Sequence, residues 1–447
     1  MESLKYLISE WLESDLPFLV ERGMGTGKIP PDVGFVITGV RRSGKTYLIY
    51  EIARKLRREI PHQNIIYINF EDDRLYPLKG DELRKLPDVY FEYFSPNEDY
   101  PIWLLLDEVQ NIPNWERSIR TFLDRRIARV VVTGSSSKLL PGEIATSLRG
   151  RTLTETVYPL GFKEFLRFKE FKVKSPQSLL YSPQKPKVLK FFNEFLEYGG
   201  FPQVVLSKEK EELLREYYRA IFYRDIVERF KIRNLSLFEN FLKLLIHQNA
   251  SLFTLGKADN FLKTLGFKLT KSTLAEYLFY IKSAFLLFEI SLFSYSTKDR
   301  LQYPRKIYTI DTGLVNSVTF RYSHNYGRML ENAIFLELLR RGKEVYYWKT
   351  KNNYEVDFVI IEGFKVKELI QVVWDISDEK TIKREERALL KAMGEFNLDK
   401  GLILTKDYSE RKKIKGKEIL YQPAWLWILE YEQAPFFKGG KNAEGKN

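Results

Sequence analysis

Short apolar runs alternate with helical patterns of apolar residues over the first third of the chain, from Gly34 to about Leu160. Such runs are typical of strands buried on both faces, and the helical patterns between them predict crossover connections. We therefore expect a parallel sheet covered by helices, preceded by an amphipathic helix over Leu4–Val20. The predicted strands are Phe35–Gly39, Ile65–Phe70, Ile102–Leu106, Arg129–Thr133 and Thr152–Val157.

The hydrophobic pattern divides the rest of the chain into three parts. Residues 161–230 are mostly helical, residues 231–325 predict three helices and a hairpin, and residues 326–435 predict a second α/β unit. In the middle part, Thr273 and Glu276 form a capping-box pair that would fix the start of a helix. The middle part is predicted to contain helices Leu252–Thr264 and Thr270–Ala284 and strands Leu286–Tyr295 and Arg305–Asp311. The last part is predicted to contain a helix starting at Glu331, strands Tyr346–Lys349, Tyr354–Ile360, Leu369–Val373 and Gly401–Thr405, and helix Lys383–Phe396.

The chain is basic, with 72 Lys and Arg against 59 Asp and Glu and a net charge of +13. Residues 231–325 contain 13 Lys or Arg and 6 Asp or Glu, and this surplus of 7 is more than half of the net charge. A surplus of this kind favours a polyanionic partner, either nucleic acid or an anionic membrane surface.

The absence of cysteine excludes disulfides, thiolate metal sites and a cysteine nucleophile, and the three histidines lack the spacing of a zinc site. The N-terminus lacks a leader pattern, and no apolar run reaches the ~18 residues of a membrane span. We therefore expect a cytoplasmic protein without a membrane partner. Abundant Lys and Glu without Cys is also compatible with a thermophilic source.

A phosphate-cradling pattern lies between the first predicted strand and the helix after it. In such a loop, Gly39 and Gly44 let backbone amides turn inward around a phosphate at the positive end of the following helix. Lys45 would contact the β- and γ-phosphates of ATP, and the Thr46 hydroxyl would bind Mg²⁺. The whole pattern, also known as a Walker A loop, is Gly39-Val40-Arg41-Arg42-Ser43-Gly44-Lys45-Thr46.

Polar residues follow the later strands of the predicted sheet. Asp107 would hold Mg²⁺, and Glu108 would act as general base towards the attacking water. Ser135, after the next strand, either reaches the γ-phosphate or belongs to a simple turn. Arg149 or Arg151 either projects towards the nucleotide of a neighbouring subunit or is an ordinary surface cation.

The motifs GVRRSGKT, LLLDEVQ, VTGSSS and LRGR, followed by PLGFKEF and GGFP, resemble those of the archaeal and bacterial AAA-type ATPases of the P-loop superfamily. They are most similar to a prokaryotic group that carries a C-terminal domain of unknown function. The resemblance implies a core strand order of 5-1-4-3-2, a helical lid over 161–230 and a homo-oligomer with subunit contact through nucleotide. Gly200 and Pro202 match the lid motif of the group, without an assigned chemistry.

The basic middle part is similar to a winged-helix domain, in which a helix enters duplex DNA and a hairpin contacts phosphates. The recognition helix would begin near Lys271 and Ser272. The alternative is a winged helix that serves for packing or assembly. The residues expected on or beside the wing are Lys298, Arg300, Arg305 and Lys306.

The last part has the layout of the PD-(D/E)XK nucleases, in which carboxylates hold magnesium and a lysine orients water. Glu331 (or Glu337) and Asp357 match the first two acids, but the later positions depart from the pattern. Gln371 stands at the second strand acid and Val373 where the lysine belongs. Lys365 or Lys367 is a possible substitute, so the site is expected to be degenerate.

Together, these patterns predict an α/β fold: a P-loop parallel-sheet core, a helical lid, a winged-helix-like domain and a C-terminal restriction-endonuclease-like domain. The expected function is ATP hydrolysis, with ATP and Mg²⁺ as cofactors, that changes conformation on DNA. The alternatives are a nucleotide-dependent switch that engages a protein partner and an ATP-gated magnesium nuclease. The predicted segments are 1–30 (N-terminal helix), 31–160 (ATPase core), 161–230 (lid), 231–325 (winged helix), 326–435 (nuclease-like domain) and 436–447 (disordered tail).

Overall fold

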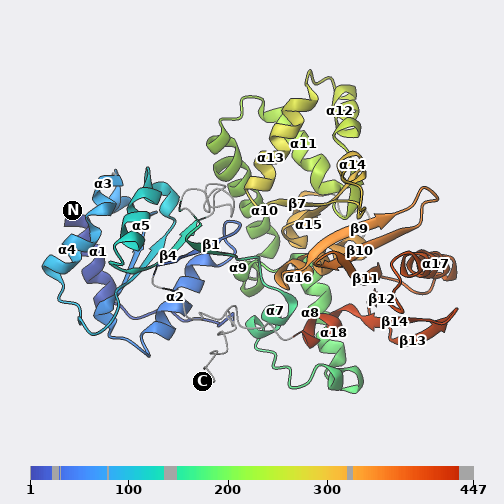
Figure 1. Cartoon of the computed structure of the whole chain (residues 1–447), viewed down its shortest axis with the longest axis horizontal. Helices are drawn as coiled ribbons and strands as arrows, with labels where there is room; N and C mark the ends of the chain where they lie inside the picture. Colours follow the sequence, from blue (N-terminus) through green and yellow to red (C-terminus); the bar gives the residue numbers. More distant parts are fainter. Residues whose placement is uncertain are drawn as a thin grey trace, which may run out of the picture. The chain divides into compact units, whose positions relative to one another are not determined.

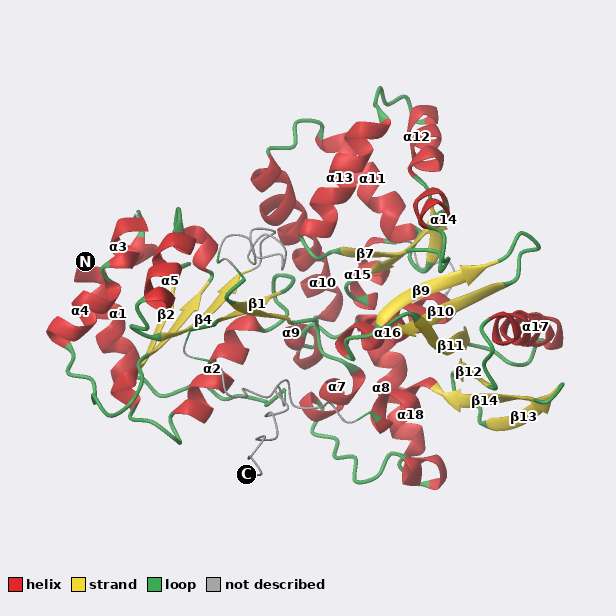
Figure 2. Ribbon diagram, in the orientation of Figure 1, coloured by secondary structure: helices red, strands yellow, loops and turns green. Residues whose placement is uncertain are grey.

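The computed structural model describes residues 2–22, 30, 32–77, 80–134, 148, 150–319 and 326–431, which form two compact units (Figures 1 and 2). The first unit runs to Val157 and the second starts at Tyr158. Within these residues, no helix combines the length and the apolar character that a membrane span requires. The predicted tail 436–447 lies outside the described residues.

The first unit is built on a five-stranded parallel sheet. Its strand order is β2-β3-β4-β1-β5, which confirms the order that the resemblance implied. Each strand starts and ends within one residue of the predicted run, because turn residues bound the apolar stretches closely. The strands are β1 Gly34–Thr38, β2 Ile65–Asn69, β3 Trp103–Asp107, β4 Arg129–Gly134 and β5 Thr152–Thr156.

Helices cover both faces of this sheet. Alternate strand residues point to opposite faces, so Val36 and Leu104 pack against α1, α3, α4 and α5, whereas Phe35 and Leu105 pack against α2. Helix α1 ends at Glu13 and not at Val20 as predicted, because Pro17 disfavours helical backbone just before it. The helices are α1 Glu2–Glu13, α2 Lys45–Leu56, α3 Gly80–Arg84, α4 Leu86–Tyr93 and α5 Trp115–Asp124, with short turns η1 His62–Asn64, η2 Asp73–Leu75 and η3 Val109–Asn111.

The second unit begins with a helical segment, as the pattern over 161–230 predicted. A Gly-Gly turn joins α8 to α9: Gly199 has a φ of 73°, and a Cβ on Gly200 would lie 2.1 Å from the Leu160 carbonyl oxygen. The Gly200 N–H donates to the buried Asp311 carboxylate over 2.7 Å, so the motif fastens these helices to a distant part of the chain. The elements are α7 Phe162–Phe168, η5 Gln177–Tyr181, α8 Lys185–Tyr198, α9 Pro202–Leu206, α10 Lys210–Ala220 and the π-helix η6 Ile221–Glu228.

The next elements form four helices, α14 being a short one in the predicted hairpin loop, and a small antiparallel sheet of order β6-β8-β7. Two predictions were wrong here. The first residues of the helix predicted over 252–264 form β6, and the N-cap of α13 is Thr270, not the Thr273–Glu276 pair, because the Thr270 hydroxyl accepts the Thr273 N–H. The elements are α11 Leu235–His247, β6 Ser251–Phe253, α12 Leu255–Thr264, α13 Lys271–Ser283, β7 Leu287–Ile290, α14 Thr297–Gln302 and β8 Arg305–Thr309.

The C-terminal part is a separate β-rich domain with a six-stranded mixed sheet of order β13-β14-β12-β11-β10-β9. Helix α17 packs on one face through Leu389 and Met393. The sequence did not predict β13, β14 or α18, because β13 is dominated by Lys and Arg. Helix α16 begins five residues before Glu331. The elements are α15 Thr312–Val318, α16 Tyr326–Arg340, β9 Glu344–Lys349, β10 Glu355–Glu362, β11 Lys365–Val373, α17 Glu379–Glu395, β12 Lys400–Thr405, β13 Glu410–Ile414, β14 Lys417–Pro423 and α18 Ala424–Glu430.

Candidate functional site

The loop between β1 and α2 folds back on itself through three residues of positive φ. Gly39, Arg42 and Gly44 have φ angles of 140°, 68° and 96°. A Cβ on Gly39 would lie only 2.3 Å from the Val157 carbonyl oxygen, so only glycine fits at this position. The loop therefore turns tightly just before α2 begins at Lys45, and a tight glycine-containing turn at a helix N-terminus is the setting of an anion cradle.

Lys45, the first residue of α2, is buried beside this loop. Its Nζ lies 3.3 Å from the Gly39 carbonyl oxygen, 3.2 Å from that of Val40 and 3.6 Å from Oε1 of Glu108. The structure thus brings together the cation of the loop and the acid at the end of β3, two predicted site residues that are far apart in sequence.

Asp107 ends β3 in a fully buried position. Its carboxylate accepts hydrogen bonds from the hydroxyls of Thr133, Tyr67 (3.1 Å) and Thr46. Burial raises the pKa of Asp107, while the Thr133 hydrogen bond and the charge of Lys45 act in the opposite direction. The two predicted magnesium ligands, Thr46 and Asp107, are therefore in direct contact.

Glu108 has a left-handed backbone, with a φ of 54°. Its N–H donates to the Thr133 hydroxyl over 3.0 Å, and its carboxylate accepts from the Gln110 side chain. Thr133 therefore holds both acids, with its hydroxyl donating to Asp107 while accepting from Glu108. The sequence pattern does not single out Thr133, although the pairing of β3 with β4 places this residue beside Asp107.

Tyr67 and Arg22 are two further residues that the sequence did not single out. The Tyr67 ring lies 5.0 Å from that of Trp11 in α1, whose indole N–H donates to the Ile65 carbonyl over 2.6 Å. Arg22 is buried, and its guanidinium donates to the Ser43 carbonyl over 2.9 Å. The N-terminal segment thus contacts both the phosphate loop and the partner of Asp107.

The remaining predicted residues of this site have different positions. Arg41 pairs with Glu71 at 3.3 Å, and Arg151 pairs with Asp124, with both members of the second pair half-exposed. Ser135 and Arg149 lie outside the described residues. Arg151 therefore has an acid of its own chain as its partner in the described structure.

The residues predicted to contact DNA differ in how exposed their side chains are. Lys271, Ser272 and Lys298 are exposed, whereas Arg300 and Arg305 are half-buried and donate to Thr297 and Ser291. Lys306 is buried, with only 3% of its surface exposed. The prediction that Lys306 contacts DNA phosphate was therefore wrong, because its ammonium is enclosed by protein.

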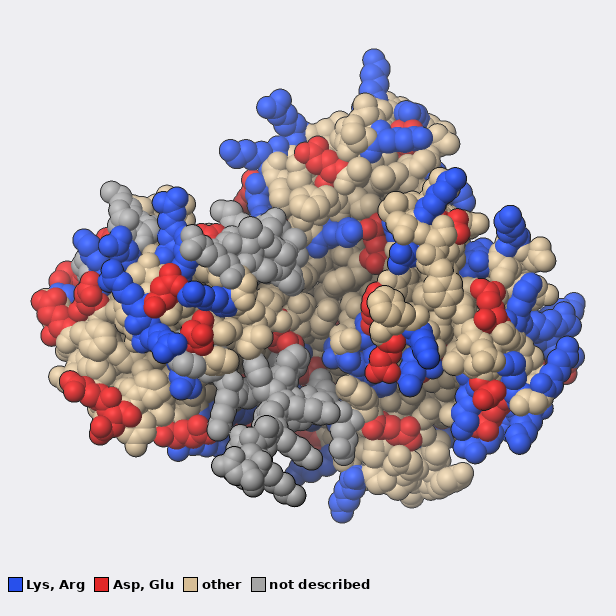
Figure 3. Space-filling model, viewed as in Figure 1, with Lys and Arg blue, Asp and Glu red and all other residues tan. Residues whose placement is uncertain are grey.

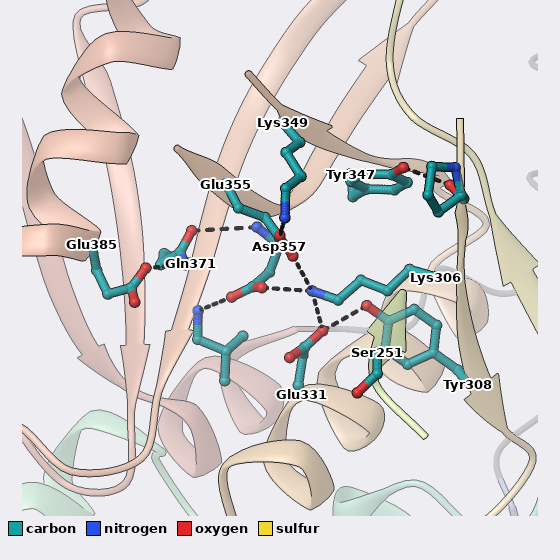
Figure 4. A network of polar contacts seen from close by, with 12 residues as sticks. Ser251, Lys306, Tyr308, Glu331, Tyr347, Lys349, Glu355, Asp357, Gln371 and Glu385 are labelled. Atoms are coloured by element: carbon teal, nitrogen blue, oxygen red, sulfur yellow. Dashed lines mark hydrogen bonds and ion pairs between the residues drawn. The ribbon is translucent and has the colours of Figure 1, made fainter. Parts of the chain in front are cut away.

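Lys306 instead belongs to a buried polar cluster together with the acids of the nuclease-like pattern (Figure 4). Its Nζ lies 2.7 Å from Glu331, 3.2 Å from Glu355 and 2.8 Å from Asp357. Burial and the charge of Asp357 raise the pKa of Glu331 to about 7. Gln371 also lies in this cluster, where its side-chain oxygen accepts from the Asp357 N–H over 3.3 Å.

The other nuclease-like candidates lie elsewhere. Glu337, the alternative to Glu331, pairs with Arg341 at 3.0 Å. Lys367 pairs with Glu362 at 3.7 Å on the surface, and Lys365 is exposed. Neither lysine substitutes for the one that Val373 replaces.

The amino-acid sequence matches three family models. Residues 34–166 match an AAA domain, residues 189–324 a domain of unknown function (DUF8612) and residues 326–425 a domain of unknown function (DUF4143). The chain is 40% identical to the uncharacterized protein MJ1544 of Methanocaldococcus jannaschii, over 90% of each chain. It is 30% identical to an uncharacterized protein of Haemophilus influenzae, over 88% of this chain and 93% of the relative.

Among solved structures, the chain is similar to the Walker-type ATPase paby2304 of Pyrococcus abyssi. The identity is 14% and the TM-score 0.42, covering 71% of this chain and 94% of the other. The ORC1 protein of Aeropyrum pernix, solved in complex with DNA, has an identity of 11% and a TM-score of 0.28, covering 71% and 91%.

Proposed function

The chain belongs to the family of the M. jannaschii protein MJ1544, with an AAA domain at its N-terminal end, and we propose that it binds ATP with Mg²⁺ and hydrolyses the nucleotide. The observation that carries this proposal is the meeting of Lys45, Asp107 and Glu108 at the edge of the phosphate loop. A cation, a buried carboxylate and a second acid are the groups that phosphoryl transfer to water requires.

The residues at the end of β3 fit a magnesium ion. Mg²⁺ prefers oxygen ligands, and the Thr46 hydroxyl and the Asp107 carboxylate are hydrogen-bonded neighbours. When bound, Mg²⁺ neutralises charge on the phosphates. Lys45 holds the transferred phosphate, and Glu108 accepts the proton of the attacking water. Thr133 keeps both acids in place, which limits the reorganisation that the reaction needs.

Two substitutions test this site. Lys45→Ala should abolish tight ATP binding, measured by isothermal titration; undiminished affinity would refute the phosphate-loop assignment. Glu108→Gln should retain ATP binding but lower the turnover rate by about a hundredfold or more, because the amide cannot accept the proton. Turnover at the wild-type rate would show that another residue is the base.

We further propose that the middle segment is a winged helix that contacts duplex DNA. The order helix, strand, helix, helix, strand, wing, strand, with β8 between β6 and β7, is that of a winged helix. Lys271 and Ser272 are exposed at the start of α13, and Lys298 is exposed in the wing. Cations at these positions would neutralise backbone phosphates.

DNA binding is tested by replacing two of these cations together. The double variant Lys271→Ala, Lys298→Ala should bind DNA more weakly. The slope of log affinity against log salt concentration should also become shallower, by the amount expected for the loss of about two phosphate contacts. Lys243→Ala is the matched control, because Lys243 is an equally basic residue of α11 that pairs with Glu239. If no DNA structure binds or alters turnover at moderate salt, the DNA proposal fails.

The rival function is a nucleotide-dependent switch that engages a protein partner. In that case ATP would change the oligomeric state, through subunit contact at the nucleotide and Arg149 or Arg151, and DNA would leave turnover unchanged. Mass measurement with and without ATP, alongside turnover with and without DNA, distinguishes the two functions.

A further inference from the structure

The ammonium of Lys306 has the surroundings of a bound cation. Three carboxylate oxygens, one from α16 and two from β10, lie 2.7 to 3.2 Å from its Nζ (Figure 4). An ammonium has three N–H donors, so each carboxylate can accept one of them. Lys306 itself comes from β8, which belongs to the other sheet of this unit.

The order α16-β9-β10-β11-α17-β12 is that of the nuclease-like fold predicted for this part, and such a fold implies a magnesium ion near Asp357. The residues do not fit a metal ion. In the described part of the chain, no group of three His, Asp or Glu side chains is arranged to hold one. Oδ1 of Asp357 contacts Lys306 and Oδ2 accepts the Val372 N–H over 2.9 Å. A divalent ion beside the ammonium would be repelled by it.

Gln371, on the neighbouring strand β11, also fails to fit a metal ion. Gln371 stands where the second strand acid is expected, and its amide group is already used by the protein. Its oxygen accepts from the Asp357 N–H, and its NH₂ group donates to Glu385 of α17. Gln371 therefore links Asp357 and Glu385 through hydrogen bonds, and its neutral side chain contributes no negative charge that could bind a cation.

Lys306 remains charged in this environment. Burial lowers its pKa, but the charges of Asp357 and Glu331 outweigh burial and raise the pKa well above its usual value. Lys349 supplies a second cation, 2.8 Å from the other oxygen of Glu355. The positive charge that these acids require thus comes from lysines of the chain itself.

We infer that Lys306 takes the place of the metal ion of a nuclease-like site and fastens the winged-helix-like segment to the C-terminal domain. Two contacts of Tyr308, which also lies in β8, support the attachment of the winged-helix-like segment to the C-terminal domain. The Tyr308 hydroxyl donates to Glu331 over 2.7 Å, and its ring stacks on Phe335 at 4.1 Å. The acids of α16 and β10 therefore hold β8 where an active nuclease would hold magnesium.

The inference is tested by Mn²⁺ binding to the nucleotide-free full chain, measured by electron paramagnetic resonance. We expect wild type and Asp357→Asn to bind Mn²⁺ equally weakly, because Lys306 occupies the site. Mn²⁺ binding by the wild type that Asp357→Asn abolishes would overturn the inference. This comparison does not depend on the folding of any Lys306 variant.

Lys306→Met keeps the length of the side chain and removes its charge. It should gain one Mn²⁺ per chain, which the additional Asp357→Asn change removes again. In Mn²⁺-free buffer, hydrogen exchange of peptides over 305–309 should become at least about tenfold faster. Lys349→Met, the matched control, removes a cation that contacts only Glu355 among these acids and should change neither result. A Lys306→Met protein that gains no Mn²⁺ and exchanges at the wild-type rate would refute the inference.

Discussion

Asp311 is a buried carboxylate on which the Gly-Gly turn depends, and its replacement by asparagine should change how stability depends on pH. Its Oδ2 accepts the Gly200 N–H over 2.7 Å. Its Oδ1 accepts the N–H groups of Gly313 and Leu314 over 2.9 and 3.3 Å. An asparagine oxygen can keep the second pair, but its NH₂ group would then face the Gly200 N–H. One buried donor without an acceptor costs about 1–3 kcal/mol.

The pH dependence follows from the raised pKa of this group. Burial raises the pKa of Asp311 from 3.8 to about 7, against the opposing effect of the N–H groups of Gly200, Leu314 and Gly313. The folded chain then holds a proton that the unfolded chain releases, so stability is highest at low pH and falls as pH rises towards 7. The slope is up to about 1.4 kcal/mol per pH unit. Between about pH 5 and pH 7 the loss amounts to roughly 2–3 kcal/mol.

The assay compares urea unfolding of the wild type with that of Asp311→Asn across this range. Hydrogen exchange of peptides from 199–206 and 311–318 follows the second unit alone. At about pH 5 the variant should be less stable by about 1–3 kcal/mol, and the difference should shrink or reverse by pH 7. Asp378→Asn is the control, because that N-cap of α17 has a lowered pKa and should show a constant difference. A pH-independent difference for Asp311→Asn would refute the reasoning.

Three further variants, one of them a double substitution, have defined outcomes. Tyr67→Phe removes a hydrogen bond to Asp107 and should raise the Mg²⁺ concentration for half-maximal turnover by about tenfold, with ATP binding little changed. Gly200→Ala would place a Cβ 2.1 Å from a backbone oxygen and should destabilise the second unit by more than about 2 kcal/mol, measured by urea unfolding. Lys413→Ala with Lys415→Ala should weaken DNA binding and lower its salt dependence, measured by fluorescence anisotropy.

The strands of the first unit could be predicted closely, because each is an apolar run bounded by turn residues. The phosphate loop and the two acids at the end of β3, Asp107 and Glu108, could also be predicted, since their chemistry requires particular residues at fixed spacing. The same sequence gave no reason to select Thr133 or Tyr67. Their roles depend on which strands are neighbours, and a hydroxyl at a strand end is common in any sheet.

Lys306 shows a different limit of sequence reasoning. It lies next to Arg305 in a basic, hairpin-like pattern, so the pattern favoured an exposed phosphate contact. In a strand, neighbouring side chains point to opposite faces, and one of the two must face the core. Which residue faces the core depends on the acids of Glu331 and Asp357, which are contributed by elements that come later in the chain.

The net charge of a domain, counted from its sequence, does not show how many of its acids are buried. Residues 326–431, all described, contain 20 Lys or Arg and 18 Asp or Glu, a surplus of only 2. Four of the acids are buried, namely Glu337, Asp357, Glu385 and Glu386, whereas no Lys or Arg of this range is buried. Among the residues of this domain that are not fully buried, 20 are cations and 14 are acids, a surplus of 6. In Figure 3 the cations gather over α17 and the β13–β14 hairpin, where Arg411, Lys413 and Lys415 are exposed. A polyanion that meets α13 and the wing would thus find a second basic surface on the C-terminal domain, although more than half of the net charge lies in residues 231–325.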